Sequence, residues 1–290
     1  MTLSTERRII TVVVIISLTF FLSFALFPVY WTSITSVKPS HEISSTENPL
    51  VVLRPTLEHY HKLFTKTRFL YWFKNSVVVS GIATLIVVIV ASFGAYSLAR
   101  LNFRGRKIIG RSVLFSYLIP RIILAIPLFT ILGILKLTDT LTGLILSYLT
   151  FALPFCTWLL IGYFQSVPTE LEESAQIDGC TRVQALFKIV FPLVTPGIIT
   201  SSVFTFTLSW NEFLYPLVFI YTDYKRTVPV AISDLQMGDI FVWGQIMAAG
   251  VIYSIPLLIL YSLIQRGLVA RLTAGAIKYN YINKAVSLNT

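Results

Sequence analysis

Residues that could carry chemistry are few in this sequence, and they do not assemble into an obvious site. His41, His59 and His61 all fall in one hydrophilic stretch. Two of these histidines follow Glu58 closely, so a metal site can be argued, but a solvated loop explains the same residues. The sequence contains no His-Glu-x-x-His, Gly-x-Ser-x-Gly or phosphate-binding glycine loop. It therefore predicts no catalytic centre, no metal site and no cofactor in this chain.

Two charged residues, Arg121 and Glu212, interrupt runs that are otherwise apolar. A carboxylate that faces lipid inside a spanning segment costs roughly 2.5 to 3.5 kcal/mol on insertion scales, so we expect Glu212 to face the protein interior or a wet cavity. Counting about 1.5 Å per residue from each inner end places Arg121 much nearer the inside than Glu212. We therefore expect no direct ion pair between them.

The composition indicates a protein that lives in a membrane. Hydrophobic residues make up 55% of the 290 residues, charged residues only 12%, and the mean hydropathy is +0.77. A soluble domain of this length could not bury so much apolar surface. The net charge of +10 could indicate nucleic acid, but the basic residues lie between apolar runs and form no basic face with interleaved aromatic residues. Lipid is therefore an expected partner, and nucleic acid is not.

Six runs are long enough to cross a bilayer, which takes about 20 apolar residues. The first could be a signal peptide, but the apolar region of a signal peptide is only about 7 to 15 residues long and ends at small residues. We therefore expect a membrane helix there as well. The six expected spans are residues 9–37, 75–99, 112–135, 141–167, 193–221 and 241–264.

Positive charge in the short connections sets the expected orientation. Five basic residues lie between the second and third spans, which places that connection in the cytoplasm by the positive-inside rule. The polar segment 38–74 holds six, but the rule is weaker for longer loops. Six spans then place both termini and the polar segment 168–192 in the cytoplasm.

Segment 168–192 reads as two short helices joined at a glycine. Thr169 is expected to cap the first helix while Glu172 reaches back to it, and Thr181 with Gln184 repeats this capping box for the second.

The glycine and the apolar residues of this segment indicate a compact surface element. Gly179 tolerates the left-handed backbone needed where the chain reverses, and Pro192 is expected to close the second helix. The second helix carries an apolar stripe at three- and four-residue steps, formed by Val183, Leu186, Phe187 and Val190. The stripe could lie on the protein's own helices or on lipid headgroups. Alternatively, it docks a soluble subunit.

The same segment resembles the EAA motif of ATP-binding-cassette (ABC) importer permeases. Glu173-Ser174-Ala175, three residues, Gly179, nine residues and then Ile189-Val190-Phe191-Pro192 match Glu-Ala-Ala, three residues, Gly, nine residues, Ile-x-Leu-Pro. Ser174 and Phe191 are the departures. The resemblance implies a coupling region seated in a groove of the ATP-binding subunit. The coupling residues it implies are Glu172, Glu173, Ala175, Asp178, Gly179, Val183, Phe187, Ile189 and Pro192.

Further stretches resemble the carbohydrate-importer branch of these permeases, the relatives of the second maltose-type permease. They are residues 55–60, 75–76, 95–106, 210–214 and 272–278. Relatives commonly end near the last stretch, whereas residues 279–290 continue here, and Arg271 stands where relatives often have glycine.

This resemblance implies an all-α fold with six transmembrane helices of the type I ABC importer class, in the inner (cytoplasmic) membrane. The expected regions are 1–70, with the first helix and an extracytoplasmic segment, the core 71–264 and a cytoplasmic tail 265–290. The implied partners are a second permease, two copies of an ATP-binding subunit and an extracytoplasmic sugar-binding protein. Because the chain lacks Gly-x-x-x-x-Gly-Lys-[Ser/Thr], ATP and Mg belong to the partner, and this chain is not an enzyme.

Two roles are possible for Glu212, the charged residue of the fifth span. As a structural residue, Glu212 would accept backbone hydrogen bonds at a helix break that Pro216 indicates. As a pathway residue, it would contact sugar hydroxyls. The expected pathway residues are Trp210, Asn211, Glu212 and Tyr215, with an aromatic face offered to a sugar ring.

Other transport classes fit less well. A secondary transporter should show two corresponding halves, and residues 9–101 and 109–264 show no convincing repeat. A membrane enzyme would need more ionisable residues at one depth. Importers of glycerol phosphates or acidic oligosaccharides remain an alternative within the ABC class.

Overall fold

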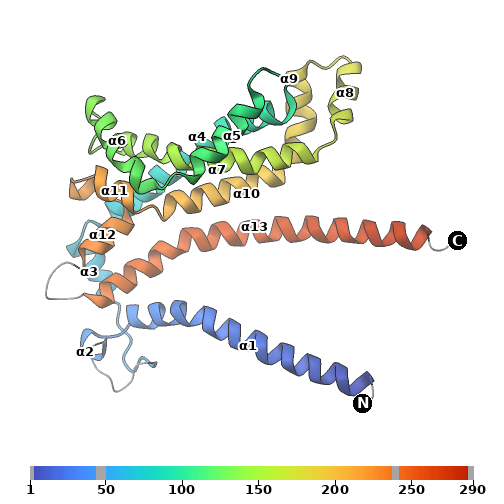
Figure 1. The fold of residues 1–290 in the computed structure, drawn as a ribbon. Coiled ribbons are helices and arrows are strands. Elements are labelled where there is room, and N and C mark those ends of the chain that lie inside the picture. The colour runs from blue at the N-terminus through green and yellow to red at the C-terminus, as the bar shows by residue number, and fades with distance from the viewer. Residues whose placement is uncertain (1–2, 44–49, 237–241, 287–290) are drawn as a thin grey trace. The chain divides into compact units, whose positions relative to one another are not determined.

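The structure is a computed structural model that describes residues 3–43, 50–236 and 242–286, with side chains described except at 3–6, 8–9 and 266–286. Throughout the described ranges the regular elements are helices, which confirms the all-α prediction (Figure 1). The α-helices are α1 (Leu3–Ser36), α2 (Ser40–Ile43), α3 (Glu58–Lys66), α4 (Phe69–Arg100), α5 (Arg106–Leu118), α6 (Arg121–Ile134), α7 (Leu141–Ser166), α8 (Thr169–Ile177), α9 (Arg182–Ala185), α10 (Phe191–Trp210), α11 (Leu214–Phe219), α12 (Val228–Asp234) and α13 (Trp243–Val286). A π turn (Leu186–Val190) precedes α10, and a 3-10 turn (Asp223–Lys225) precedes α12.

Five helical stretches of the described chain are long and apolar enough to cross a membrane. They are Ile10–Ser36, Phe69–Arg100, Leu141–Ser166, Arg182–Trp210 and Trp243–Gln265. The predicted third span is not one straight helix, because α5 and α6 are bent by 100° across a short break. Pro120 causes the break: proline lacks an N–H group and disfavours helical backbone at the residue before it. Counted as one broken span, this bent pair would bring the total to the six spans that the sequence predicts.

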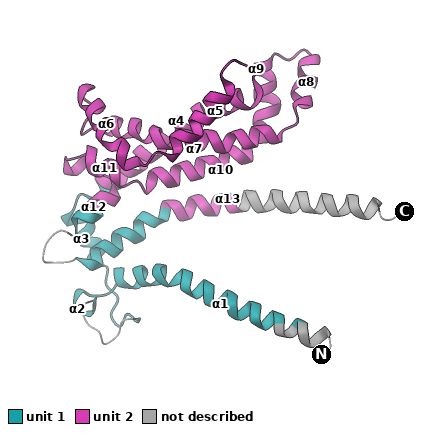
Figure 2. Ribbon diagram, viewed as in Figure 1, with its two compact units in different colours: residues 1–70, 232–255 teal, residues 71–231, 256–290 magenta. Residues whose placement is uncertain are grey.

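The chain divides into two compact units (Figure 2), one of residues 1–70 and 232–255 and the other of residues 71–231 and 256–290. In the first unit, the large apolar side chains between Ile10 and Tyr30 of α1 are mostly exposed, as expected of a helix that faces lipid. His59 of α3 is only 4% exposed, and its Nε2 atom lies 2.7 Å from the carbonyl oxygen of Lys38. A Cβ atom on Gly244 would lie 2.2 Å from the His59 ring. The solvated-loop interpretation is therefore wrong for His59, which fills the space that Gly244 leaves.

The core of the second unit is built mainly from α4 and α7, with contributions from α6, α10 and α11. Small residues on one face of α4, including Ala83, Ala91 and Ala95, are buried in it. Such residues let helix backbones approach closely, and this close packing holds helices together in a bilayer, where the hydrophobic effect does not drive their association. Helices α7 and α10 also pack closely, because a Cβ atom on Gly197 would lie 2.2 Å from the Tyr163 ring. This core connects segment 168–192 at one end of α7 with the 136–140 turn at the other.

Candidate coupling surface and paired helix breaks

Local hydrogen bonds build the turn of segment 168–192 as the sequence predicts. Gly179 has a φ of +89°, in the left-handed region that favours glycine. Its N–H group donates to the carbonyl of Gln176 and the N–H group of Cys180 donates to that of Ala175, which is a Schellman motif ending α8. Helix α9 then begins with the predicted capping box, in which Thr181 and Gln184 each accept a backbone N–H of the other. The two helices are thus joined by a short turn that is held by local hydrogen bonds.

Glu172 does not cap α8, so the first predicted capping box is wrong. Its side chain is buried, and it accepts a hydrogen bond from the Tyr96 hydroxyl. Its other carboxylate oxygen lies 4.0 Å from Nε of Arg100, an electrostatic contact rather than a hydrogen bond. Arg100 also donates to the carbonyl of Val167. The carboxylate therefore ties α8 to the end of α4, because buried charged groups require partners that an exposed cap does not supply.

Pro192 does not end the second helix. Helix α10 begins at Phe191 and continues through Pro192 to Trp210. The preceding π turn closes on a hydrogen bond from the N–H of Phe191 to the carbonyl of Leu186. The helical stretch therefore runs without interruption from Arg182 to Trp210, with Pro192 inside it. The second short helix therefore continues directly into a spanning helix, and the two must move together.

The apolar stripe of the second short helix divides between the core and the surface. Leu186 and Val190 are buried, at 5% and 0% exposure, whereas Val183 and Phe187 are 63% and 52% exposed. The Phe187 ring still contacts that of Phe191 edge-on, with centroids 5.1 Å apart. Neither of the two predicted roles thus describes the whole stripe: half of it packs against this chain, and half remains available to a partner.

The other predicted coupling residues are placed at different depths. Glu173 and Asp178 are exposed, Ala175 is buried, Ile189 is half-buried and Pro192 is exposed. Ile177 was not predicted as a coupling residue, although at 86% it has the largest exposed fraction among the large apolar residues of the described chain. Its position at the end of the first short helix, immediately before Asp178 and Gly179, could have indicated that it is exposed beside the turn. Ile177 and Val183 together present apolar surface on either side of the turn.

A second site forms where two broken helices meet. Glu212 lies in the break between α10 and α11, and its Oε1 accepts the N–H groups of Leu214 (3.0 Å) and Tyr215 (3.2 Å). Its Oε2 lies 2.6 Å from Nη1 of Arg121, the first residue of α6. The expectation of no ion pair is therefore wrong. A constant rise per residue does not apply to the third span, because the 100° bend at Pro120 redirects the chain.

Burial makes this pair a structural contact between α6 and α11. The Glu212 side chain is 3% exposed and that of Arg121 is 35% exposed. The guanidinium carbon also lies 4.1 Å from the centroid of the Phe151 ring, a cation–π contact. The hydrogen bonds from the N–H groups of Leu214 and Tyr215 are those that the predicted structural role of Glu212 requires. Its role in a pathway stays a prediction.

The aromatic residues predicted for the pathway are covered in this structure. Trp210 is 1% exposed, and its ring stacks on Phe206 and meets Phe73 edge-on. Tyr215 is fully buried, with its hydroxyl 3.4 Å from that of Thr150. Asn211 is exposed, and its amide donates to a backbone carbonyl of α10. In this conformation neither ring presents a free face, so binding a sugar ring there would require these helices to move.

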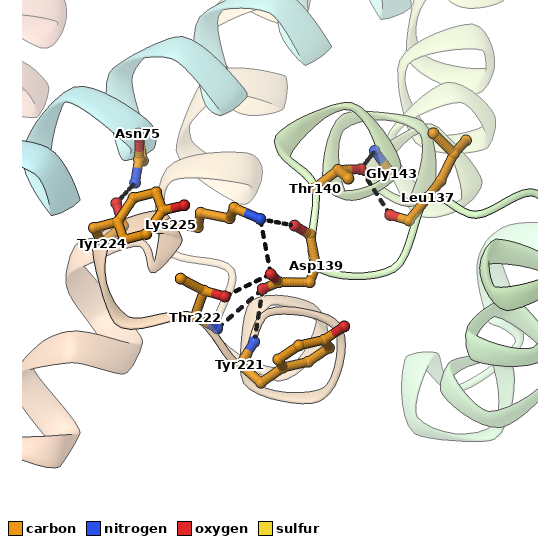
Figure 3. A network of polar contacts seen from close by, with 9 residues as sticks. All are labelled: Asn75, Leu137, Asp139, Thr140, Gly143, Tyr221, Thr222, Tyr224 and Lys225. Carbon is orange, nitrogen blue, oxygen red and sulfur yellow. Dashed lines mark hydrogen bonds and ion pairs between the residues drawn. The ribbon is translucent and has the colours of Figure 1, made fainter.

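A third polar network, at the other end of α7 from the coupling segment (residues 168–192), was not predicted (Figure 3). Asp139 accepts the N–H groups of Tyr221 (3.1 Å) and Thr222 (2.9 Å) and the Thr222 hydroxyl (2.6 Å). Its carboxylate also pairs with Nζ of Lys225 at 2.8 Å. Burial alone would raise the pKa of Asp139, but these hydrogen bonds outweigh it and lower the pKa to about 2. The turn after α6 is thus bound to the loop after α11.

Helix α4 holds the same loop from another side. The Asn75 amide donates to the carbonyls of Tyr224 (2.8 Å) and Arg226 (3.0 Å), and the Ser76 hydroxyl accepts the N–H of Val228 (2.9 Å). Asn75 and Ser76 belong to a stretch that resembles the carbohydrate-importer permeases, but no role was predicted for them. Only the fold brings residues so far apart in the sequence together.

Comparisons with known proteins agree with this architecture. The model of the family described as "Binding-protein-dependent transport system inner membrane component" matches residues 88–274. The sulfoquinovosyl glycerol transport system permease protein SmoH of Agrobacterium fabrum is 38% identical over 253 residues, covering 87% of this chain and 89% of the relative. The trehalose/maltose transport system permease protein MalG of Thermococcus litoralis is 36% identical over 257 residues, covering 87% and 91%.

A solved structure shares the fold. The crystal structure of a bacterial ABC transporter involved in the import of the acidic polysaccharide alginate superposes with a TM-score of 0.77, at 22% identity, covering 90% of this chain and 97% of the other. The family match spans more than half of the chain, and it includes the capped turn at Gly179 and the Arg121–Glu212 pair. This chain therefore belongs to the family of binding-protein-dependent transport system inner membrane components, as a multi-pass protein of the inner membrane.

Proposed function

We propose that this chain is the permease subunit of an ABC importer and forms half of the membrane pathway for a sugar or oligosaccharide. A binding protein delivers the substrate on the outer side, and two copies of a separate ATP-binding subunit, which hold ATP and Mg, hydrolyse ATP on the inner side. A second permease completes the pathway. Both termini of this chain are cytoplasmic in this proposal.

The coupling segment carries the proposal. It combines exposed apolar residues, Ile177 and Val183, with a turn whose backbone groups are bonded internally. Such a surface can accept a protein partner without unfolding. Because Glu172 ties α8 to α4 and the π turn leads directly into α10, a displacement of this segment would move two spanning helices. This arrangement suits the conversion of ATPase closure into helix rotation.

Affinity purification of the tagged chain from its native membrane tests the assembly. We expect a P-loop ATPase and a second permease to co-purify, and the reconstituted complex to import a sugar when ATP and the binding protein are supplied on opposite sides. A transport-competent assembly of this chain alone, without an ATPase, would show that the proposal is wrong.

An acidic saccharide is a second candidate substrate. The Arg121 side chain is 35% exposed, beside Glu212 and the Phe151 ring. One relative is named for a sulfonated sugar derivative, sulfoquinovosyl glycerol. Thermal-shift screening of the co-purified binding protein against matched neutral and acidic saccharides separates the two candidates, since a stabilising ligand raises its melting temperature. Glycerol phosphates belong in the same screen.

A further inference from the structure

A pocket of about 820 Å³ lies in the second unit, between the end of α4, the start of α5 and the second half of α7. Within the described residues, it is separate from the coupling segment and from the Arg121–Glu212 pair. Its lining is of two kinds. Lys107 and Arg111 stand at one end, and Leu114, Trp158 and Ile161 continue from them along α5 and α7.

Among the described residues, no carboxylate neutralises the cationic end. Lys107 and Arg111 are four residues apart on α5, so they are neighbours on one face of that helix. Both are exposed, and in the described part of the chain neither forms an ion pair with a carboxylate. Two adjacent cations repel each other, and an anion placed between them would remove that cost.

The pocket wall is held in place by the chain itself. Arg106 donates from Nε to the carbonyl of Leu98 (2.7 Å) and from Nη2 to that of Ala99 (2.9 Å), which satisfies the end of α4. Gly105 has a φ of +87°, which allows the sharp turn into α5. Arg106 is therefore committed to the fold, whereas Lys107 and Arg111 remain available.

The apolar end distinguishes among anions. Trp158 is 49% exposed on a helix that spans the membrane, and none of the residues of α5 is buried. A free phosphate would use only the cationic end, whereas a phospholipid would use both. Basic pockets between spanning helices on the cytoplasmic side are suited to anionic headgroups.

We propose that this pocket binds an anionic phospholipid, with its phosphate at Lys107 and Arg111 and an acyl chain along Leu114 and Trp158. The inference rests on the cytoplasmic orientation given under the proposed function. It does not depend on which substrate is transported.

Quenching of tryptophan fluorescence tests the site in the purified complex with its partner subunits. Brominated phosphatidylglycerol, mixed into phosphatidylcholine vesicles, should quench more strongly than brominated phosphatidylcholine, and Trp158→Phe should remove the difference. Lys107→Gln and Arg111→Gln should each weaken phosphatidylglycerol binding about fivefold. Lys107→Arg should preserve it. Arg104→Gln is the matched control, because Arg104 is an exposed cation of the same connection but does not line the pocket.

Three results would overturn the proposal. They are equal quenching by the two lipids, an equal loss in Arg104→Gln, and full displacement of phosphatidylglycerol by inorganic phosphate. If a partner subunit covers Trp158, neither lipid quenches it. The quenching is then equal for the two lipids, which is the first of these results. Since the measurement uses neither sugar nor ATP, selective quenching supports the lipid site even in a complex that imports no sugar.

Discussion

The contact between Arg121 and Glu212 gives the sharpest test of how this fold is held together. Glu212 accepts three hydrogen bonds, two from the backbone of α11 and one from Arg121, while it is almost fully buried. In Glu212→Gln, the one remaining carbonyl oxygen can serve the backbone N–H groups. The new amide N–H group would then face the Nη1 donor of Arg121, so that hydrogen bond is lost.

The expected cost follows from burial and charge. A hydrogen bond to a charged group contributes about 1.5 to 3 kcal/mol, and leaving a charged partner unmatched adds to the loss when that partner is buried. Because Arg121 is 35% exposed, water can replace part of the lost contact. We therefore expect Glu212→Gln to destabilise the protein by about 2 kcal/mol. Arg121→Gln should cost about 1 to 3 kcal/mol, since it leaves the buried carboxylate with only its two backbone donors.

A double-mutant cycle measures the pair directly. Unfolding of the purified complex in mixed micelles gives the change in free energy for each single variant and for Arg121→Gln/Glu212→Gln. We expect the double variant to be less destabilised than the sum of the singles by about 1 to 2 kcal/mol. Additivity within about 0.5 kcal/mol would refute the reasoning, because residues that do not interact behave in that way.

Transport assays on the same variants separate the two roles of Glu212. If the residue is structural, assembly or basal ATPase activity should change alike whatever the substrate. If it also lines the pathway, assembly should survive while uptake falls unequally among sugars. Unchanged assembly, ATPase activity and uptake would contradict both roles.

Three further predictions concern the coupling segment and the Asp139 network. Gly179→Val should insert normally but lose uptake, because a β-branched residue in the left-handed conformation costs about 1 to 2 kcal/mol, even though a Cβ atom there would meet open space. Gly179→Asn should retain most uptake. Wild-type uptake in the valine variant would contradict this prediction. Ile177→Asp should weaken ATPase retention on an affinity column without changing the unfolding midpoint, because it places a charge on the exposed apolar surface. Glu170→Gln, an exposed change in the same short helix, should retain the ATPase better, and equal retention by both variants would contradict a docking role for Ile177. The folded pKa of Asp139, about 2, lies below the ordinary value near 4, so its stabilisation should be complete at neutral pH and lost only as pH falls from about 4 to 2. Asp139→Asn should lower the unfolding midpoint at pH 7 and reduce the loss of stability between about pH 4 and 2. An unchanged midpoint at pH 7 would contradict this prediction.

The sequence by itself determined the class of the fold and much of the coupling turn. Apolar runs of this length can satisfy their backbone groups in a bilayer only as helices or closed barrels, and their length here indicates helices. Gly179 and the Thr181–Gln184 capping box were also predictable, since these devices act over a few residues and depend on side-chain type. The family resemblance carried by this segment was confirmed as well.

Tertiary structure decided how the charged residues are partnered. Glu172 could cap its own helix or bind elsewhere, and only the approach of α4 brought Tyr96 and Arg100 to it. The Arg121–Glu212 pair likewise depends on two helix breaks, whose angle cannot be computed from spacing along the chain. Packing also divided the apolar stripe, because periodicity shows that a face is apolar but not which of its residues the core will cover. Local rules thus fixed the elements, whereas the long-range contacts that satisfy buried charges arose only once the helices were assembled.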